Sequence, residues 1–419
     1  MLHRHREGAR QEARVPGGAP LAGGQDQHRG SVDPGAGRLD RQLPWDPGAR
    51  EVRRGLPEHP AAAQPLIPHS KPSVTDDDAE RVARVVRSGQ LAQGPEVAAF
   101  ERELAARLGV QDAAAVASGT VALELALAAL GIGAGDEVLI PTYVCDALHH
   151  AVRRGGATPV LVDADPVTQS LSAKDARARR TRRTRAVIVP HAFGLVADLE
   201  PFQALEVPVI EDCAQALGAR TPAGHPAGAD GALAVCSFYA TKMIAAGEGG
   251  AVAGPAALVA RVREARDYDE QETLAPRTNA KLTDMAAALA RGQLARLDAF
   301  VARRRALAAR YRAALAGAPV RLPADAGPRH VYHRFVLGLD RDPAGVAAAL
   351  AARGVAARRP VFRPAHRALG LGGYPEADRL WGESLSIPCY PALTDDEAEH
   401  VGRALAAVLA ASPQGEPTR

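Results

Sequence analysis

The sequence contains little cysteine and no long apolar run. Its four cysteines lie far apart, without a Cys-x-x-Cys pair: Cys145, Cys213, Cys236 and Cys389. This spacing indicates neither a disulfide framework nor a zinc site, so we expect no metal centre. No stretch approaches 18 consecutive apolar residues, and the first residues lack the charged head and apolar core of a signal peptide. We therefore expect no membrane partner and a location in the reducing cytoplasm.

A strong excess of one charge is also missing. The chain has 51 basic and 48 acidic residues among 419, which gives a formal net charge of +3. One basic run, "KDARARRTRRTR" at 174–185, is the exception, and it has no interleaved aromatic residues. A solvated surface explains such a run better than a nucleic-acid site, so we expect no nucleic-acid partner.

Residues 1–65 are rich in Arg, Gly, Pro and Gln and show no sustained helix or strand period. Such a segment cannot bury enough apolar surface to offset the entropy lost on ordering. We expect a disordered extension or a translation start placed too far upstream, and a separate functional arm is the alternative. Residues 413–419 are expected to be a flexible tail. The ordered chain is expected from residue 66, with a helix starting after Thr75.

The next two hundred residues alternate short apolar runs with helical segments. The runs predict strands, for example at 137–141, 186–190 and 207–212, and helices are expected between them. This alternation predicts an α/β fold with a mostly parallel sheet. A large domain is expected over 66–305 and a smaller C-terminal α+β domain over 306–412. Ligands of parallel sheets bind beyond the carboxyl ends of the strands, so the residues after each run are the functional candidates.

Polar residues at two such places favour an anion and a cation. Ser118, Gly119 and Thr120 start a predicted helix, where free N–H groups and the helix dipole favour a phosphate. A simple N-cap is the alternative interpretation. Asp212 ends an apolar strand, where a carboxylate needs a cation or several donors. A protonated pyridine nitrogen would be such a cation, and helix capping is again the alternative.

Lys242 follows the next apolar run, in "CSFYATK", and precedes a Gly-Glu-Gly-Gly turn. A lysine forms a Schiff base only when its amine is unprotonated, which requires burial or a neighbouring cation to lower its pKa to roughly 7–8. An exposed surface lysine is the alternative. Together, a helix start for phosphate, a carboxylate and a lysine at strand ends are the groups that pyridoxal phosphate requires of a protein.

Four motifs occur in a specific order: "GQLAQGPEVAAFERELA", "ASGTVALELALAALGIGAGDEVLIP", "VIEDCAQALGA" and "SFYATKMIAAGEGG". In this order they closely resemble the DegT/DnrJ/EryC1/StrS family of sugar aminotransferases. The resemblance extends from about Pro68 to about Ala411. It implies the fold-type I architecture of PLP-dependent transferases, with pyridoxal 5'-phosphate as cofactor and a homodimer that completes the active site across its interface.

The resemblance also implies roles for single residues. Lys242 would hold the cofactor and move the proton between substrate and cofactor, and Asp212 would pair with the ring nitrogen. Gln215 would lie against the ring near its phenolic oxygen. The partner subunit would donate Asn279 to the phosphate. The remaining phosphate contacts would come from Ser118, Gly119, Thr120 and Ser237.

The sequence departs from the family pattern at two places. Cys145 stands where an aromatic residue commonly stacks on the cofactor ring, and Tyr143 precedes it by two positions. Cys145 could pack on the ring through its sulfur, or Tyr143 could take this place. Lys281 replaces an arginine and offers a point charge instead of a planar fork. Substrate contacts or structural roles are expected for three histidines: His191, His333 and His366.

The resemblance implies a PLP-dependent aminotransferase that converts a keto sugar, expected to be nucleotide-linked, with glutamate or glutamine as amino donor. Such an enzyme would serve amino-sugar biosynthesis for a polysaccharide or an antibiotic. A keto-cyclitol substrate is an alternative. A PLP-dependent sugar dehydratase is disfavoured because such relatives have histidine in place of Lys242. The intact set of Lys242, Asp212 and Gln215 also disfavours a non-catalytic regulatory protein that only binds the cofactor.

Overall fold

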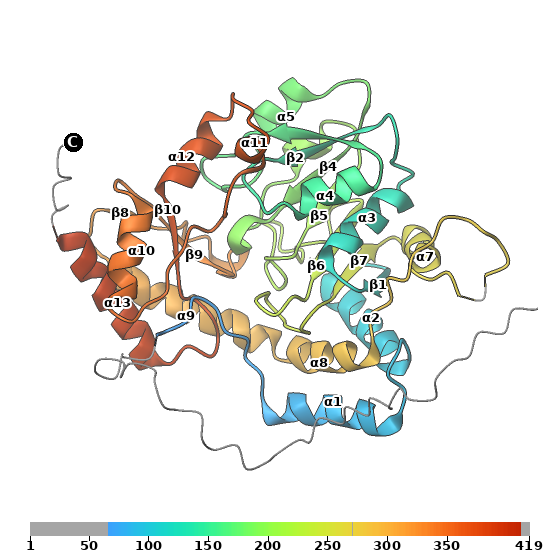
Figure 1. Ribbon diagram of the computed structural model, residues 1–419, viewed down its shortest axis with the longest axis horizontal. Coiled ribbons are helices and arrows are strands. Elements are labelled where there is room, and N and C mark those ends of the chain that lie inside the picture. Colours follow the sequence, from blue (N-terminus) through green and yellow to red (C-terminus); the bar gives the residue numbers. More distant parts are fainter. Residues whose placement is uncertain (1–65, 270, 412–419) are drawn as a thin grey trace, which may run out of the picture. The chain divides into compact units, whose positions relative to one another are not determined.

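A seven-stranded sheet forms the centre of the large α/β part of the chain. The computed structural model describes residues 66–269 and 271–411 (Figure 1). The predictions for 1–65 and 413–419 lie outside these residues. The strand order is β1-β7-β6-β5-β4-β2-β3. The strands are β1 (Asp112–Val116), β2 (Glu137–Pro141), β3 (Thr158–Val162), β4 (Thr184–Pro190), β5 (Val209–Asp212), β6 (Leu233–Ser237) and β7 (Gly250–Gly254).

Most of this sheet is parallel, as predicted. Neighbouring strands from β3 to β6 pair in parallel, whereas β7 pairs antiparallel with both β6 and β1. The parallel strands therefore bring their carboxyl ends to one edge of the sheet. Pro190, Asp212 and Ser237 stand at this edge as the last residues of β4, β5 and β6.

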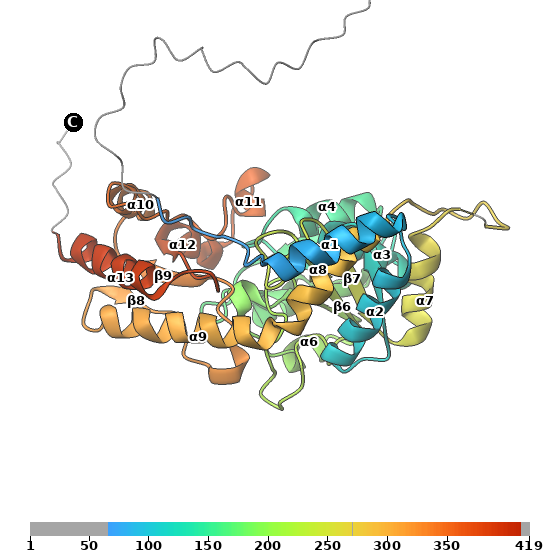
Figure 2. The same cartoon turned by 90° about the horizontal axis from the view of Figure 1, so that it is seen from below.

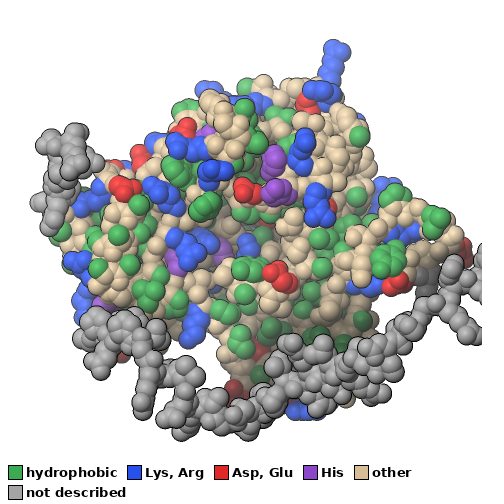
Figure 3. Space-filling model, viewed as in Figure 1, with side chains coloured by type: hydrophobic (Ala, Val, Ile, Leu, Met, Phe, Trp, Pro, Cys, Tyr) green, Lys and Arg blue, Asp and Glu red, His purple; other side chains and the backbone are tan. Residues whose placement is uncertain are grey.

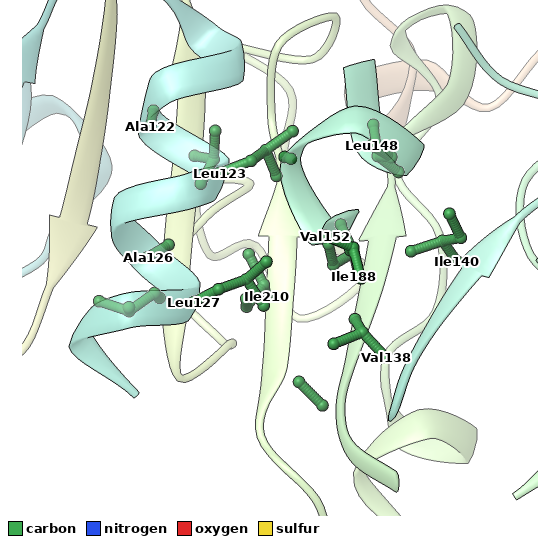
Figure 4. Close-up of a cluster of buried hydrophobic side chains, with 14 of the residues drawn as sticks. Ala122, Leu123, Ala126, Leu127, Val138, Ile140, Leu148, Val152, Ile188 and Ile210 are labelled. Atoms are coloured by element: carbon green, nitrogen blue, oxygen red, sulfur yellow. The ribbon is translucent and has the colours of Figure 1, made fainter. Parts of the chain in front are cut away.

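Apolar residues hold helices against the sheet. Helix α3 (Gly119–Ala129) packs Leu123 and Leu127 towards β5, and α4 (Ala147–Arg154) packs Val152 beside Ile188 of β4 (Figure 4). All of these side chains are buried. Because full burial of a leucine, isoleucine or valine stabilises the fold by about 1.5–3 kcal/mol, this core fixes the start of α3 relative to the strand ends.

Further helices cover the large sheet. Thr75 caps α1 in a capping box with Asp78, which confirms the predicted helix start. Helix α1 lies beside α8 in both views (Figure 2), and Arg296 after α8 forms an ion pair with buried Asp78. These helices are α1 (Asp76–Ser88), α2 (Pro95–Leu108), α5 (Ala173–Arg179), α6 (Glu200–Gln203), α7 (Ala256–Ala265) and α8 (Asp284–Ala295), with a 3-10 turn at Ala192–Gly194.

The C-terminal part has its own antiparallel sheet and its own apolar core. Three strands pair in the order β10-β9-β8: β8 (Val320–Arg321), β9 (Phe335–Leu339) and β10 (Ser384–Ile387). Its helices are α9 (Leu297–Ala314), α10 (Pro343–Ala351), α11 (Ala365–Ala368), α12 (Pro375–Glu383) and α13 (Asp395–Ala410), with a 3-10 turn at Gly327–Arg329. The domain boundary at about residue 305 stays a prediction, because α9 continues through it.

No helix among residues 66–269 and 271–411 combines the length and the apolar composition that crossing a membrane requires. The longest helix, α9, has 18 residues and contains several arginines. All four cysteines are free thiols, and only Cys145 is exposed.

Candidate active site

A cavity of about 1190 Å³ opens at the carboxyl ends of the central parallel strands. One wall comes from the large sheet and its loops, and the other comes from the C-terminal part, including His333 and Arg334 before β9 and residues 357–363. Figure 3 shows this face of the molecule, with basic and histidine side chains gathered near its middle. Most of the predicted site residues line the cavity: Ser118, Gly119, Thr120, Tyr143, Cys145, His191, Asp212, Gln215, Ser237, Lys242 and His333.

The start of helix α3 offers free N–H groups to this cavity. Ser118 is the N-cap, and its hydroxyl accepts the N–H of Val121 at 3.3 Å. The N–H groups of Gly119 and Thr120 have no acceptor within the described part of the chain. Capping and anion binding are therefore compatible here, because the cap occupies a donor deeper in the first turn.

Two glycines allow the helix start to lie directly on the sheet. A Cβ at Gly119 would stand 2.8 Å from the Cβ of Ser237. A Cβ at Gly250, on β7, would stand 2.5 Å from the carbonyl of Ser118. Larger residues at either position would push the helix away from the strands. The close approach places Ser237 beside the free N–H groups, as a phosphate site requires.

Asp212 is a buried carboxylate with few donors. Its side chain is only 8% exposed and accepts one hydrogen bond, from the N–H of Ala214 at 3.0 Å. Burial raises the pKa of this carboxyl, although the charges of Lys242 and His191 act in the opposite direction. A protonated ring nitrogen in the cavity would supply the missing opposite charge, so the structure fits the role that the resemblance implies.

Lys242 lies half-buried in the loop that joins β6 to β7. Backbone hydrogen bonds close this loop, from Ala240 N–H to the Gly247 carbonyl and from Phe238 N–H to the Gly249 carbonyl. The amine forms no ion pair with any described residue. Burial raises the pKa of both Asp212 and Cys145, and the charge of Lys242 opposes this rise at both groups. Lys242 is therefore close to both groups and free to reach a ligand between them.

Gln215 and Phe193 fix the rim of the cavity. The Gln215 side-chain oxygen accepts the N–H of Phe193 at 2.8 Å. Phe193 has a left-handed backbone conformation, with φ at +56°, and Gly194 follows with φ at +97°. A Cβ at Gly194 would stand 2.8 Å from the backbone nitrogen of His333. Such strained positions persist where the surroundings impose them, and here they bring the two walls together.

Cys145, and not Tyr143, presents an accessible side chain to the cavity. Cys145 is exposed, whereas Tyr143 is 2% exposed. The Tyr143 hydroxyl donates to the Leu380 carbonyl at 3.4 Å, and its ring meets Phe193 edge-on at 6.3 Å. These contacts hold Tyr143 in the wall. The geometry therefore favours the thiol as the group over the cofactor ring.

The structure gives the three histidines different surroundings. His191 is fully buried, and its ring nitrogens contact Glu211 at 2.9 Å and the N–H of Ala197 at 3.2 Å. His366 does not line the cavity, since it contacts Thr142 at 2.8 Å and Asp378 at 3.1 Å. These contacts favour a structural role for His366, whereas His191 also lines the cavity and keeps both roles open. His333 differs because its Nδ1 is buried without a hydrogen-bond partner.

Asn279 and Lys281 lie away from the cavity. Asn279 is exposed in the loop between α7 and α8 and does not line the cavity of its own chain. Lys281 forms ion pairs with Asp267 and with Asp269, the latter at 2.9 Å. The resemblance implies that Asn279 contacts the phosphate of a partner subunit.

The sequence analysis missed the arginines of the cavity wall, which are Arg334, Arg358, Arg359 and Arg363. Arg334 directly follows His333 in "YHRF" and precedes β9. Arg358 pairs with Ser386 of β10 through backbone hydrogen bonds. In the sequence, Arg334 is marked only by its place next to the candidate His333. The sequence alone does not show which groups surround its side chain.

Comparison with known proteins agrees with this geometry. The model of the DegT/DnrJ/EryC1/StrS aminotransferase family matches residues 72–406. The chain is 39% identical, over 76% of its length and 91% of the relative, to the erythromycin biosynthesis sensory transduction protein EryC1 of Saccharopolyspora erythraea. It is 37% identical, over 76% and 89%, to dTDP-3-amino-3,4,6-trideoxy-alpha-D-glucose transaminase of Streptomyces venezuelae. A crystal structure of S. venezuelae DesV with a ketimine intermediate is 35% identical, with a TM-score of 0.76, and covers 80% and 95%.

Proposed function

Because this chain belongs to the DegT/DnrJ/EryC1/StrS aminotransferase family, we propose that it transfers an amino group from glutamate or glutamine to a nucleotide-linked keto sugar. The family confirms the predicted fold-type I architecture and a PLP-dependent aminotransferase. The transaminase relative is named for a dTDP-linked amino sugar, which supports the substrate class. The observation that carries the proposal is the convergence of Lys242, Asp212 and the α3 start on one cavity.

The residues of the cavity fit pyridoxal phosphate. When bound, the cofactor supplies an aldehyde that takes up the amine and a ring that withdraws electrons from the bond being broken. The N–H groups of Gly119 and Thr120, with the Ser237 hydroxyl, would hold the phosphate at the helix dipole. The Asp212 carboxylate would keep the ring nitrogen protonated. These assignments rest on the free donors and on the buried, under-bonded carboxylate.

Lys242 is the residue that we propose to move protons. Its amine has no ion-pair partner among the described residues and lies within electrostatic reach of Asp212 and Cys145. Its long, flexible stem would let Nζ take a proton from the substrate carbon and deliver it to the cofactor carbon.

We also propose a homodimer in which Asn279 reaches the phosphate of the other subunit. Asn279 lies in an exposed loop together with Leu274, whose side chain has full solvent exposure. The location that we propose is the cytoplasm, where the four free thiols would stay reduced.

The purified protein should develop a visible absorption band when pyridoxal phosphate is added, and Lys242→Ala should lose it. Lys174→Ala, which removes an exposed lysine of α5, should keep the band. Transfer of the amino group is then tested with keto sugars and glutamate. A wild-type protein that takes up no cofactor would contradict the proposal.

A regulatory role is the second candidate, since the EryC1 relative is named a sensory transduction protein. Glutamate alone separates the two. A catalyst converts the absorption of the bound cofactor to that of its amine form, because the first half of the reaction needs no sugar. A protein that only binds the cofactor would show no such change.

A further inference from the structure

Arg334 is a cation in the cavity wall without a carboxylate partner. It forms no ion pair with any residue of 66–269 or 271–411, and its guanidinium contacts only the His69 ring, at 3.3 Å. Burial and the charges of Arg358 and Arg304 lower its pKa to about 10, so it remains charged at neutral pH. His69 supplies no negative charge, and burial together with the charges of Arg334 and Arg358 lowers its pKa to about 3, so that it stays neutral.

Two groups beside Arg334 also lack a partner among the described residues. His333 is 6% exposed, and its Nδ1 atom has no hydrogen-bond partner. Arg358 lines the same cavity and likewise forms no ion pair within the described part of the chain. By contrast, the neighbouring Arg359 pairs with Asp342 at 3.3 Å and stacks on Trp381 at 4.6 Å. Three arginines of the cavity, Arg334, Arg358 and Arg363, thus have no ion pair among the described residues, and Arg334 is the least exposed of them.

Arg334 is also close to the reacting groups. The charge of Lys242 acts on His333, the residue next to Arg334. Arg334 itself is within electrostatic reach of Cys145, which in turn is close to Lys242 and Asp212. An anion at Arg334 would therefore share the cavity with Lys242 and Asp212.

We infer that Arg334, with the free Nδ1 of His333, binds the carboxylate next to the amino group of the donor. This inference rests on the proposed aminotransferase function. The planar fork of a guanidinium matches a carboxylate with two parallel hydrogen bonds. In an α-amino acid this carboxylate is attached to the reacting carbon, whereas the diphosphate of a nucleotide sugar is attached to a different carbon from the keto group. Arg334 therefore favours an α-amino acid as the amino donor.

Arg334→Gln tests this site without relying on turnover. The variant keeps a donor for His69 but loses the charge. Its visible cofactor band should be unchanged, which shows that the protein folds. Glutarate, a dicarboxylate without an amine, should bind at least about tenfold more weakly in calorimetry, since a hydrogen bond to a charged group is lost. Arg310→Gln, which removes a surface arginine paired with Asp395, is the control for charge.

Single-turnover conversion of the cofactor by different amine donors tests whether Arg334 binds the carboxylate next to the donor amino group. With glutamate or alanine, the concentration for half-maximal rate should rise at least about tenfold in Arg334→Gln. With 4-aminobutyrate, which has no carboxylate next to its amine, the wild type and the variant should react alike. Arg334→Lys should give an intermediate result, because it keeps the charge and loses the fork.

The proposal is overturned if glutarate and glutamate bind Arg334→Gln as they bind the wild type. It is also overturned if only the affinity for UDP or dTDP falls, because Arg334 would then serve the diphosphate of the sugar. A wild-type protein whose cofactor responds to no amino acid would instead contradict the proposed function. Glutarate binding would still decide the role of Arg334 in that case.

Discussion

Gly250 lies so close to the start of helix α3 that replacing it with alanine gives a sharp test of the phosphate site. The new Cβ would stand 2.5 Å from the carbonyl carbon and oxygen of Ser118 and 2.6 Å from the nitrogen of Gly119. Ordinary contacts begin at 3.4 Å, so the backbones must separate by 3.4 − 2.5, or about 0.9 Å. Neither side yields easily, because Gly250 pairs with both β1 and β6.

Two effects should follow from Gly250→Ala. Overpacking of this kind costs about 1–3 kcal/mol of unfolding free energy, which lowers the melting temperature by a few degrees. The shift also moves the free N–H groups of Gly119 and Thr120 away from the phosphate. Loss of one hydrogen bond to a charged group, about 1.5–3 kcal/mol, weakens cofactor binding by roughly 10- to 150-fold.

The assay compares melting temperatures with and without pyridoxal phosphate and measures cofactor affinity by fluorescence titration. Gly372→Ala is the matched control, because its added Cβ meets nothing within 4 Å. If Gly250→Ala matches this control in both stability and affinity, the reasoning about the helix start is wrong. A loss of stability with unchanged affinity would place the phosphate elsewhere.

Three further changes test the charges and the ring contact. Burial raises the pKa of the Asp212 carboxyl, so its charged form destabilises the cofactor-free protein at neutral pH, and Asp212→Asn should raise the melting temperature. This gain should shrink as the pH falls towards 4, because the carboxyl of the wild type then becomes protonated. A gain that does not depend on pH would contradict this. His69 and His330, with pKa values lowered to about 3, should destabilise the fold as the pH falls below 6.5. In urea unfolding at pH 5, each histidine should lower the free energy of unfolding by about 2 kcal/mol. An equal loss of stability in a variant with both His69→Gln and His330→Gln would refute this. Cys145→Phe should strengthen cofactor binding about 2- to 10-fold by stacking, and weaker binding would show that the thiol position is already filled.

The sequence predicts those strands whose apolar runs are continuous. The run at 137–141 coincides with β2 (Glu137–Pro141), and the run at 186–190 lies within β4 (Thr184–Pro190). The analysis did not predict β1 or β7, which read "DAAAV" and "GAVAG". Alanine and glycine have little strand propensity, so these strands depend on pairing with each other and on the close approach of α3.

The sequence predicts the site residues at the strand ends of the large sheet better than it predicts the site residues of the C-terminal part. Asp212 and Lys242 stand at or after strand ends, where the topology of a parallel sheet brings them together. Arg334 and Arg358 reach the cavity only because the second sheet packs against the first. His366 was a candidate by position, yet its partners Thr142 and Asp378 became visible only in the folded chain.

The two walls of the cavity carry opposite charges that the described protein does not neutralise. Asp212 ends β5 of the large sheet, and Arg334 precedes β9 of the smaller sheet. Buried charges without partners destabilise a fold, and here each faces a ligand of the opposite sign: the cofactor ring and the donor carboxylate. Each ligand should therefore stabilise the protein by neutralising one of these buried charges as well as by its other contacts. Since a ligand at a hundred times its dissociation constant adds about 2.7 kcal/mol, cofactor and glutarate should each raise the melting temperature, and Arg334→Gln should reduce only the second rise.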